Sequence, residues 1–235
     1  MRSPIFLITI AIVFFIVSLG SGAVAAESSL SAVGPESISP GELMLRRLLV
    51  SASGLIYWGG VIVQARRVRK KIGRIPNLKP KGRKERVLWV GWMIVVFGWI
   101  VQPVFVNETA FVPALAHRAA LISGVALIVL GYLATLWCYA AMGAAWRIGI
   151  DIGGTSSLVQ AGPYRLIRHP IYSFQMVMLV GAALLLPTLA SLMILALHFI
   201  CASIKSGDEE VHLTKVFGGE YREYMTRSGR FFPRI

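Results

Sequence analysis

The sequence predicts an all-α, polytopic integral membrane protein: a helical bundle with a five-span core that ends in a helical hairpin. Of the 235 residues, 56% are hydrophobic and only 15% are charged. The mean hydropathy is +0.68, and the apolar residues form runs of about 20, the length that crosses a bilayer. A soluble domain of this size would not carry so many long apolar runs.

Residues 4–26 form the first apolar run, which follows a single early arginine, Arg2, and ends in the small residues AVAAE. A secretory signal peptide has this order of features, and the run is also long enough to span a membrane. We therefore expect residues 1–26 to be an N-terminal transmembrane helix or a signal peptide, and residues 42–235 to form the membrane domain.

Three further runs, at 43–65, 87–106 and 116–141, each predict one spanning helix. The last apolar stretch, 170–204, is too long for one span, and Pro187 interrupts it near its middle. Proline lacks a backbone N–H and favours a turn. Two helices of roughly 17 residues each would fit a bilayer at about 1.5 Å rise per residue, so this stretch predicts a hairpin.

The orientation follows from charge. Residues 65–86 contain eleven Lys and Arg against one acid, Glu85, which predicts a cytoplasmic loop; the same loop could also attract anionic lipid headgroups. The hairpin then brings two polar segments, 142–172 and 203–235, to that face. We expect an integral membrane protein whose C-terminus and active site lie at the cytoplasmic face.

The net charge of +13 needs no nucleic-acid partner, because cytoplasmic membrane edges are already rich in Lys and Arg. The two cysteines, Cys138 and Cys201, lie within or at the end of apolar runs and have neither disulfide nor metal-ligand spacing. We expect membrane lipids as partners, no nucleic acid and no metal. The stretch GIDIGG at 149–154 is not a dinucleotide fingerprint.

Residues 162–172 hold two tyrosines, two arginines, a histidine and two prolines. Pro170 suits the first position of a helix, whose free N–H groups favour an anion. Arg168 and His169 add donors, and the two tyrosines add flat faces fit to stack on a purine. The alternative is a charged collar that anchors a membrane helix.

The second polar segment places three acids, Asp208, Glu209 and Glu210, just past the exit of the hairpin. They could bind an ammonium or ribose hydroxyls. The alternative is that they begin a last cytosolic helix, where the helix dipole favours acidic residues. Together on one face, the two clusters suggest a zwitterionic adenosine cofactor.

The two clusters form a paired motif: Gly162-Pro163-Tyr164, Arg168-His169-Pro170 and Tyr172, then Glu209-Glu210, Leu213, Phe217-Gly218, Tyr221 and Tyr224. Over about residues 130–233 the pair resembles the isoprenylcysteine carboxyl methyltransferase family, which belongs with the membrane phospholipid methyltransferases. Membrane sterol reductases share a version of the first motif, but they are much longer chains. The resemblance implies S-adenosylmethionine as methyl donor, bound without a Rossmann domain, and a five-span core that begins near residue 42.

The resemblance also implies site residues. The expected cofactor-binding residues are Leu158, Val159, Tyr164, Arg168, His169, Pro170, Ile171, Tyr172, Glu209 and Glu210. The family places an arginine four residues before the first glutamate to hold the substrate carboxylate. This sequence has Lys205 there, which lacks the bidentate fork of arginine. Arg147 could supply the fork, or it could be an interfacial side chain that snorkels; Lys205 and Arg147 are the expected catalytic residues.

A carboxylate acceptor has a pKa of about 3.5 to 4 and needs no general base. No obvious base is present, which favours such an acceptor or a self-ionising thiol. We therefore expect an isoprenylcysteine carboxyl methyltransferase-like enzyme that transfers a methyl group to a lipidic acceptor. The alternatives are a phospholipid N-methyltransferase and a non-catalytic membrane protein that retains the fold.

Overall fold

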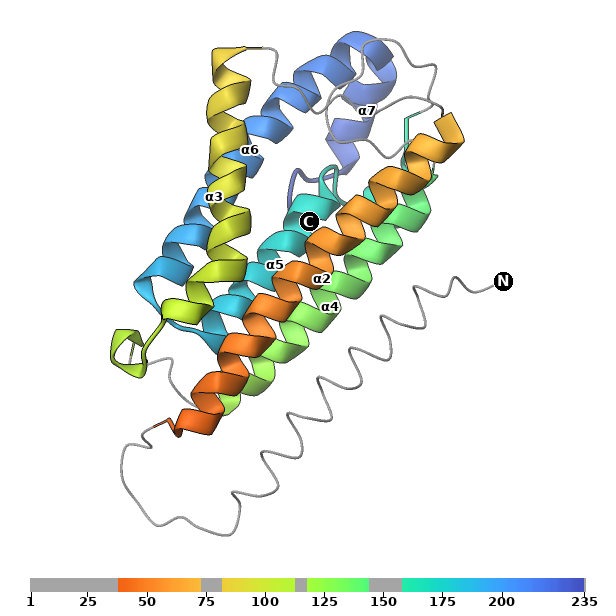
Figure 1. The fold of residues 1–235 in the computed structure, drawn as a ribbon. Helices are drawn as coiled ribbons and strands as arrows, with labels where there is room; N and C mark the ends of the chain where they lie inside the picture. Colours follow the sequence, from red (N-terminus) through yellow and green to blue (C-terminus); the bar gives the residue numbers. More distant parts are fainter. Residues whose placement is uncertain (1–37, 73–81, 113–117, 144–157, 235) are drawn as a thin grey trace.

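The computed structural model describes residues 38–72, 82–112, 118–143 and 158–234, and these form one helical bundle (Figure 1). The long helices are α2 (Pro40–Ile72), α3 (Arg83–Phe105), α4 (Arg118–Met142) and α6 (Leu189–Phe217). The shorter ones are η1 (Glu108–Ala110), η4 (Gly162–Arg165), α5 (Pro170–Leu185) and α7 (Gly219–Arg227).

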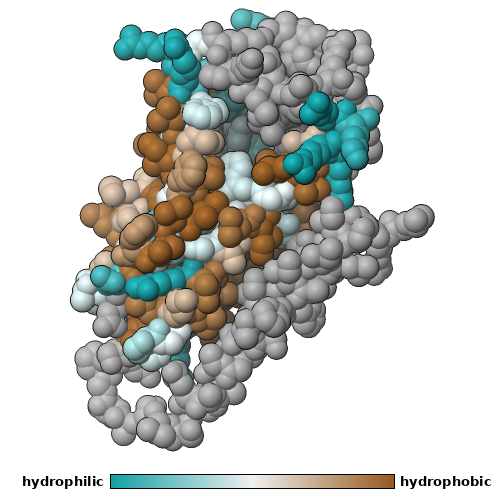
Figure 2. All heavy atoms as spheres, in the orientation of Figure 1, coloured by the Kyte–Doolittle hydropathy of each residue, from teal (hydrophilic) through white to brown (hydrophobic). Residues whose placement is uncertain are grey.

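The four long helices are each long and apolar enough to cross a membrane, and α5 is a shorter apolar helix of 16 residues. The predicted all-α membrane bundle is thereby confirmed. The N-terminal segment, residues 1–26, which was expected to be a transmembrane helix or a signal peptide, lies outside the described residues. Large apolar side chains remain exposed around the bundle, for example Phe105 and Trp137, and apolar residues predominate over its middle in Figure 2. Exposed apolar surface on this scale fits contact with lipid.

The hairpin turns where it was predicted to turn, because α5 ends at Leu185 and α6 begins at Leu189. However, α6 has 29 residues rather than about 17. It runs on past the apolar stretch until Gly218, whose φ of 55° lies in the region that favours glycine. The three acids at 208–210 consequently lie inside α6, so the interpretation that they begin a last helix is wrong.

Polar contacts hold the hairpin turn. Thr188 caps α6, its hydroxyl accepting a hydrogen bond from a backbone N–H of the first helical turn. Gln102 of α3 donates to the same hydroxyl at 3.0 Å. Arg46 of α2 is fully buried, donates to the carbonyl of Leu185 at 3.1 Å and pairs with Glu42 at 2.6 Å. A carbonyl left free at the end of α5 is thus satisfied.

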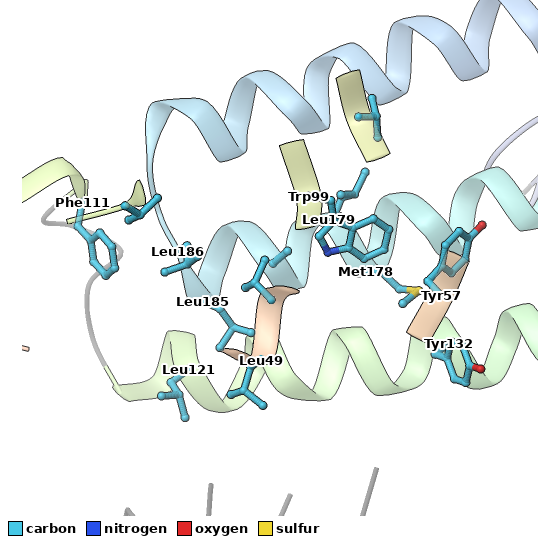
Figure 3. Packing of buried hydrophobic residues seen from close by; sticks show 14 residues of the cluster. Leu49, Tyr57, Trp99, Phe111, Leu121, Tyr132, Met178, Leu179, Leu185 and Leu186 are labelled. Carbon is cyan, nitrogen blue, oxygen red and sulfur yellow. The ribbon is translucent and has the colours of Figure 1, made fainter. Parts of the chain in front are cut away.

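Helices α4 and α5 pack backbone against backbone through glycines. A Cβ added to Gly181 would lie 2.5 Å from the carbonyl oxygen of Gly124, and one added to Gly131 would lie 2.8 Å from that of Phe174. Small residues at these positions let the two helices approach closely. Beside this seam, α2 and α3 contribute Tyr57 and Trp99 to the buried core (Figure 3).

Successive helices run in opposite directions. The ends of α2, α4 and α6 and the beginnings of α3 and α5 therefore share one end of the bundle (Figure 1). We call this the motif end, because it holds residues 158–170 and 205–234.

Candidate functional site

The first motif sits on the end of α4. Gly162 has a φ of 60°, and a Cβ there would lie 3.1 Å from that of Ala141. Glycine is therefore required for both the backbone conformation and the close contact. Tyr164 is 7% exposed, and its hydroxyl donates to the sulfur of Met142 at 2.8 Å. The motif tyrosine thus points into the bundle.

The C-terminal segment 228–231 runs beside the first motif, backbone to backbone. The N–H of Arg168 donates to the carbonyl of Gly229 at 2.8 Å, and the N–H of His169 donates to that of Arg230 at 3.0 Å. These bonds fix the backbone of the motif immediately before α5 begins.

Side-chain contacts also join the C-terminal segment 228–231 to the first motif and α5. The hydroxyl of Ser173 donates to the carbonyl of Phe231 at 2.7 Å. The ring of Phe231 is buried, with its centroid 6.3 Å from the ring of His169 and 6.1 Å from that of Phe199. The end of the chain is therefore part of the site's framework.

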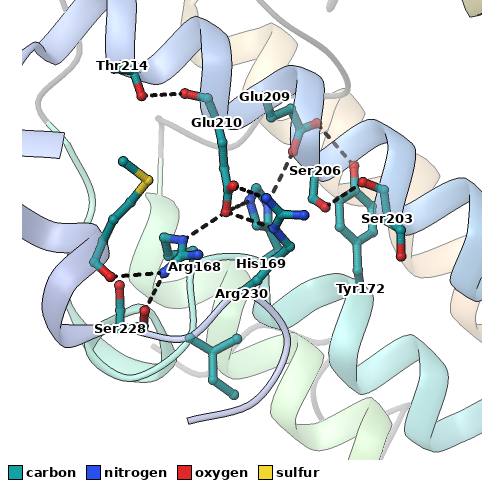
Figure 4. Close-up of polar contacts among 12 residues, drawn as sticks. Arg168, His169, Tyr172, Ser203, Ser206, Glu209, Glu210, Thr214, Ser228 and Arg230 are labelled. Atoms are coloured by element: carbon teal, nitrogen blue, oxygen red, sulfur yellow. Dashed lines mark hydrogen bonds and ion pairs between the residues drawn. The ribbon is translucent and has the colours of Figure 1, made fainter. Parts of the chain in front are cut away.

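A buried carboxylate, Glu210 of α6, joins these segments (Figure 4). Arg168 Nε donates to its Oε1 at 2.8 Å. Arg230 Nε donates to the same oxygen at 3.1 Å, and Arg230 Nη2 donates to Oε2. Arg168 Nη1 also donates to the backbone carbonyl of Ser228. Both oxygens of Glu210 are thus occupied by charge-assisted hydrogen bonds from the protein itself.

The neighbouring Glu209 has a different environment. Its Oε1 accepts from the Tyr172 hydroxyl at 3.1 Å, and its Oε2 lies 3.3 Å from His169 Nδ1. Its side chain is 22% exposed, against 9% for Glu210. A carboxylate has about four lone-pair sites, so Glu209 keeps the capacity to accept hydrogen bonds from a ligand.

Tyr172 orients this carboxylate and is itself held by other rings. It stacks with Trp92 of α3 at a centroid distance of 5.8 Å and with His169 at 6.0 Å. Its ring therefore contacts protein rings and its hydroxyl contacts Glu209. This arrangement ties α3 and α5 to α6 at the motif end.

His169 is 7% exposed and faces both glutamates. Burial alone would lower its pKa, but the neighbouring carboxylates of Glu209 and Glu210 outweigh burial and raise the pKa of His169 above its ordinary value. Its Nε2 lies 3.5 Å from Glu210 Oε1 and has no hydrogen-bond partner in the described part of the chain. The ring therefore carries more positive charge near neutral pH than a free histidine.

The other residues expected to contact the cofactor lie in α5 or in the segment before η4. Pro170 begins α5, as predicted, and is buried. Ile171 is half-buried and packs with Tyr139 of α4. Leu158 and Val159 are half-buried and lead into η4.

Lys205 and Arg147 were expected to bind the acceptor, and the structure describes only one of them. Lys205 lies on α6 four residues before Glu209, hence one turn away on the same face, and is half-buried. Arg147 lies outside the described residues.

Sequence reasoning missed the contribution of the chain's end. Arg230 was not among the expected site residues, whereas its side chain donates hydrogen bonds to Glu210. The sequence offers a weak signal, an Arg-Phe-Phe run in an otherwise polar tail. The approach of Arg168 to Ser228 had no signal, because it follows from the folded path alone.

Comparison with known proteins finds a similarity to one family. Residues 119–220 match the family described as phospholipid methyltransferase. This part of the chain is therefore similar to the phospholipid methyltransferases. The family is in the membrane methyltransferase group that includes the isoprenylcysteine carboxyl methyltransferases, so the resemblance inferred from the paired motif is confirmed.

Two curated relatives also match. The cobalt-zinc-cadmium resistance protein CzcN of Cupriavidus metallidurans is 34% identical over 115 residues, which cover 48% of this chain and 47% of the relative. The nickel-cobalt-cadmium resistance protein NccN of Alcaligenes xylosoxydans xylosoxydans is 35% identical over 115 residues, which cover 47% and 51%. The chain thus spans about half the length of the curated relatives it matches. Within the described residues, no group of three or more His, Cys, Asp or Glu could hold a metal ion.

The site residues fit the cofactor implied by the paired motif. Glu209 is part-exposed and has lone pairs for ribose hydroxyls or an ammonium. His169 has a buried nitrogen without a hydrogen-bond partner in the described part of the chain. A zwitterionic nucleoside presents donors and acceptors that would satisfy both groups.

Proposed function

We propose that this protein is an integral-membrane methyltransferase that transfers a methyl group from S-adenosylmethionine to a lipidic acceptor, with a carboxylate favoured. The observation that carries the proposal is the part-exposed Glu209 carboxylate, held by Tyr172 and His169. When bound, S-adenosylmethionine supplies a methyl group on a sulfonium, which a carboxylate oxygen can take without losing a proton.

The site residues divide into two roles in this proposal. Glu209, His169, Leu158 and Val159 contact the cofactor. Arg168 and Glu210 act as positioning residues, because the protein already occupies their polar atoms. Tyr164, Pro170, Ile171 and Tyr172 shape the wall that excludes water and aligns the reactants, the main source of rate in a displacement of this kind.

The acceptor end of the site depends on Lys205. Four residues on an α-helix rise about 6 Å, so Lys205 lies one turn closer to the apolar part of α6 than Glu209 does. Its ammonium can orient a carboxylate that arrives from the membrane. Arg147 is a second candidate for this role.

The motif end is proposed to face the cytoplasm. Exposed basic residues gather there at the end of α2 and the beginning of α3, among them Arg66, Arg69, Lys70, Arg83 and Arg86. Such residues mark the cytoplasmic side of a membrane protein. A soluble cofactor would then enter from the cytoplasm, and a lipidic acceptor from the side.

The test is methyl transfer by the full chain in lipid nanodiscs. Methyl-labelled S-adenosylmethionine is offered with a farnesyl-cysteine analogue or with phosphatidylethanolamine. We expect base-labile label on the farnesyl-cysteine analogue, reduced at least tenfold in Lys205→Met and unchanged in Asp208→Asn, an exposed pair with Lys84. Base-stable label on phosphatidylethanolamine alone would overturn the carboxylate assignment. If the protein neither transferred the methyl group nor bound the cofactor, the proposal that it is a methyltransferase would be refuted.

A further inference from the structure

A buried polar pair lies inside the bundle, beyond the site described above. Tyr57 of α2 is 3% exposed and donates to Gln175 Oε1 of α5 at 3.2 Å. Gln175 is 2% exposed, and its Nε2 has no hydrogen-bond partner in the described part of the chain. An unpaired amide N–H at membrane depth is costly, so this donor calls for a ligand.

The position of Gln175 links it to the proposed site. It follows Tyr172 by three residues on α5, so the two side chains share a face and Gln175 lies about 4.5 Å further along the helix. Tyr172 is the residue that holds Glu209. The unpaired amide N–H of Gln175 therefore lies about one helical turn from the Glu209 carboxylate, toward the apolar middle of the bundle.

A cavity lies one helical turn further along α5. Met178 follows Gln175 by another three residues and lines a cavity of about 40 Å³ between α2, α4 and α5. Ile56, next to Tyr57, and Val129 of α4 also line it. Both are half-buried, which places the cavity near the edge of the bundle. Its walls are largely aliphatic, as the chain of a lipid requires.

We infer that Gln175 and this cavity form the acceptor path: the Gln175 amide donates to the carboxylate of a lipidic acceptor, and the cavity receives the first part of its apolar chain. The free group is an N–H donor because the Tyr57 hydroxyl occupies the amide oxygen. A donor suits a carboxylate and cannot receive an ammonium. A neutral donor also orients the carboxylate without neutralising it. The inference rests on the proposed function and adds the residues that select the acceptor.

The test measures acceptor binding directly, in the full chain without cofactor. Calorimetry follows N-acetyl-S-farnesylcysteine and, for comparison, farnesylamine. Gln175→Met keeps the volume of the side chain and removes its donor; we expect about tenfold weaker binding of the carboxylated probe, the loss of one hydrogen bond to a charged group. Val129→Phe, which fills the cavity, should weaken both probes. Leu130→Phe is the control, because Leu130 is the next residue on α4 and 60% exposed.

Three outcomes would overturn the acceptor path: equal binding of the carboxylated probe by wild type and a folded Gln175→Met, tighter binding of farnesylamine, or equal effects of Val129→Phe and Leu130→Phe. Binding of labelled S-adenosylmethionine, measured separately, should be the same in Gln175→Met and wild type. Absence of that binding in wild type would refute the proposed function, whereas intact cofactor binding with no effect of Gln175→Met would refute only the acceptor path.

Discussion

Replacing Glu210 by glutamine should lower the free energy of unfolding by about 3 kcal/mol. Each hydrogen bond to a charged group contributes about 1.5–3 kcal/mol, and Glu210 accepts from two arginines. The Arg168 side chain is only 11% exposed, so its charge would lose a buried partner, which costs about 3–5 kcal/mol. The Arg230 contact adds little, because that side chain is 43% exposed. Glutamine retains one oxygen acceptor, which favours the lower end of the range.

Thermal unfolding in detergent micelles measures this loss. For a chain of this length, 3 kcal/mol corresponds to a fall of roughly 6–12 °C in the midpoint. The matched control is Asp208→Asn, two residues away on α6, whose partner Lys84 lies at 2.6 Å with side chains 37% and 62% exposed. An exposed pair contributes at most about 1 kcal/mol. If both variants unfold at the same temperature, Glu210 does not hold the motif end together.

Two further predictions concern His169 and the glycine seam. Because its pKa is raised, protonated His169 contributes stability that is complete below about pH 6.5 and lost as the pH rises through the raised pKa. Wild type should therefore lose more stability than His169→Gln between pH 6 and 9, and parallel melting curves would refute the ion pairing. Gly181→Ala should cost about 1–3 kcal/mol, since its Cβ would meet Gly124. Gly59→Ala, with nothing within 4 Å, should be neutral or stabilising; equal melting shifts would contradict close packing.

The hairpin shows why much of the fold could be predicted. A run from 170 to 204 exceeds one span, and a proline at its middle has no N–H to continue a helix. Once the turn at Pro187 is accepted, the polar segments on either side must return to the same end. The structure accordingly has Arg168 in contact with Glu210.

Residues that act through tertiary contacts could not be predicted in the same way. Arg230 follows the last helix in a short basic tail, and only the folded path brings it to Glu210. The length of α6 was underestimated because the apolar run ends near Lys205, whereas the helix continues to Phe217 and is capped by Gly218. Gln175 did leave a signal, one amide in an apolar helix, but its partner Tyr57 is 118 residues away.

Equilibrium binding of labelled S-adenosylmethionine to the purified full chain tests the central claim most directly. The claim is that the part-exposed Glu209 carboxylate, fixed by Tyr172 and His169, holds the cofactor. Wild type and Asp208→Asn should bind saturably with similar affinity, and Glu209→Gln should bind at least tenfold more weakly at a temperature at which all three proteins remain folded. Equal binding by wild type and Glu209→Gln would contradict the claim.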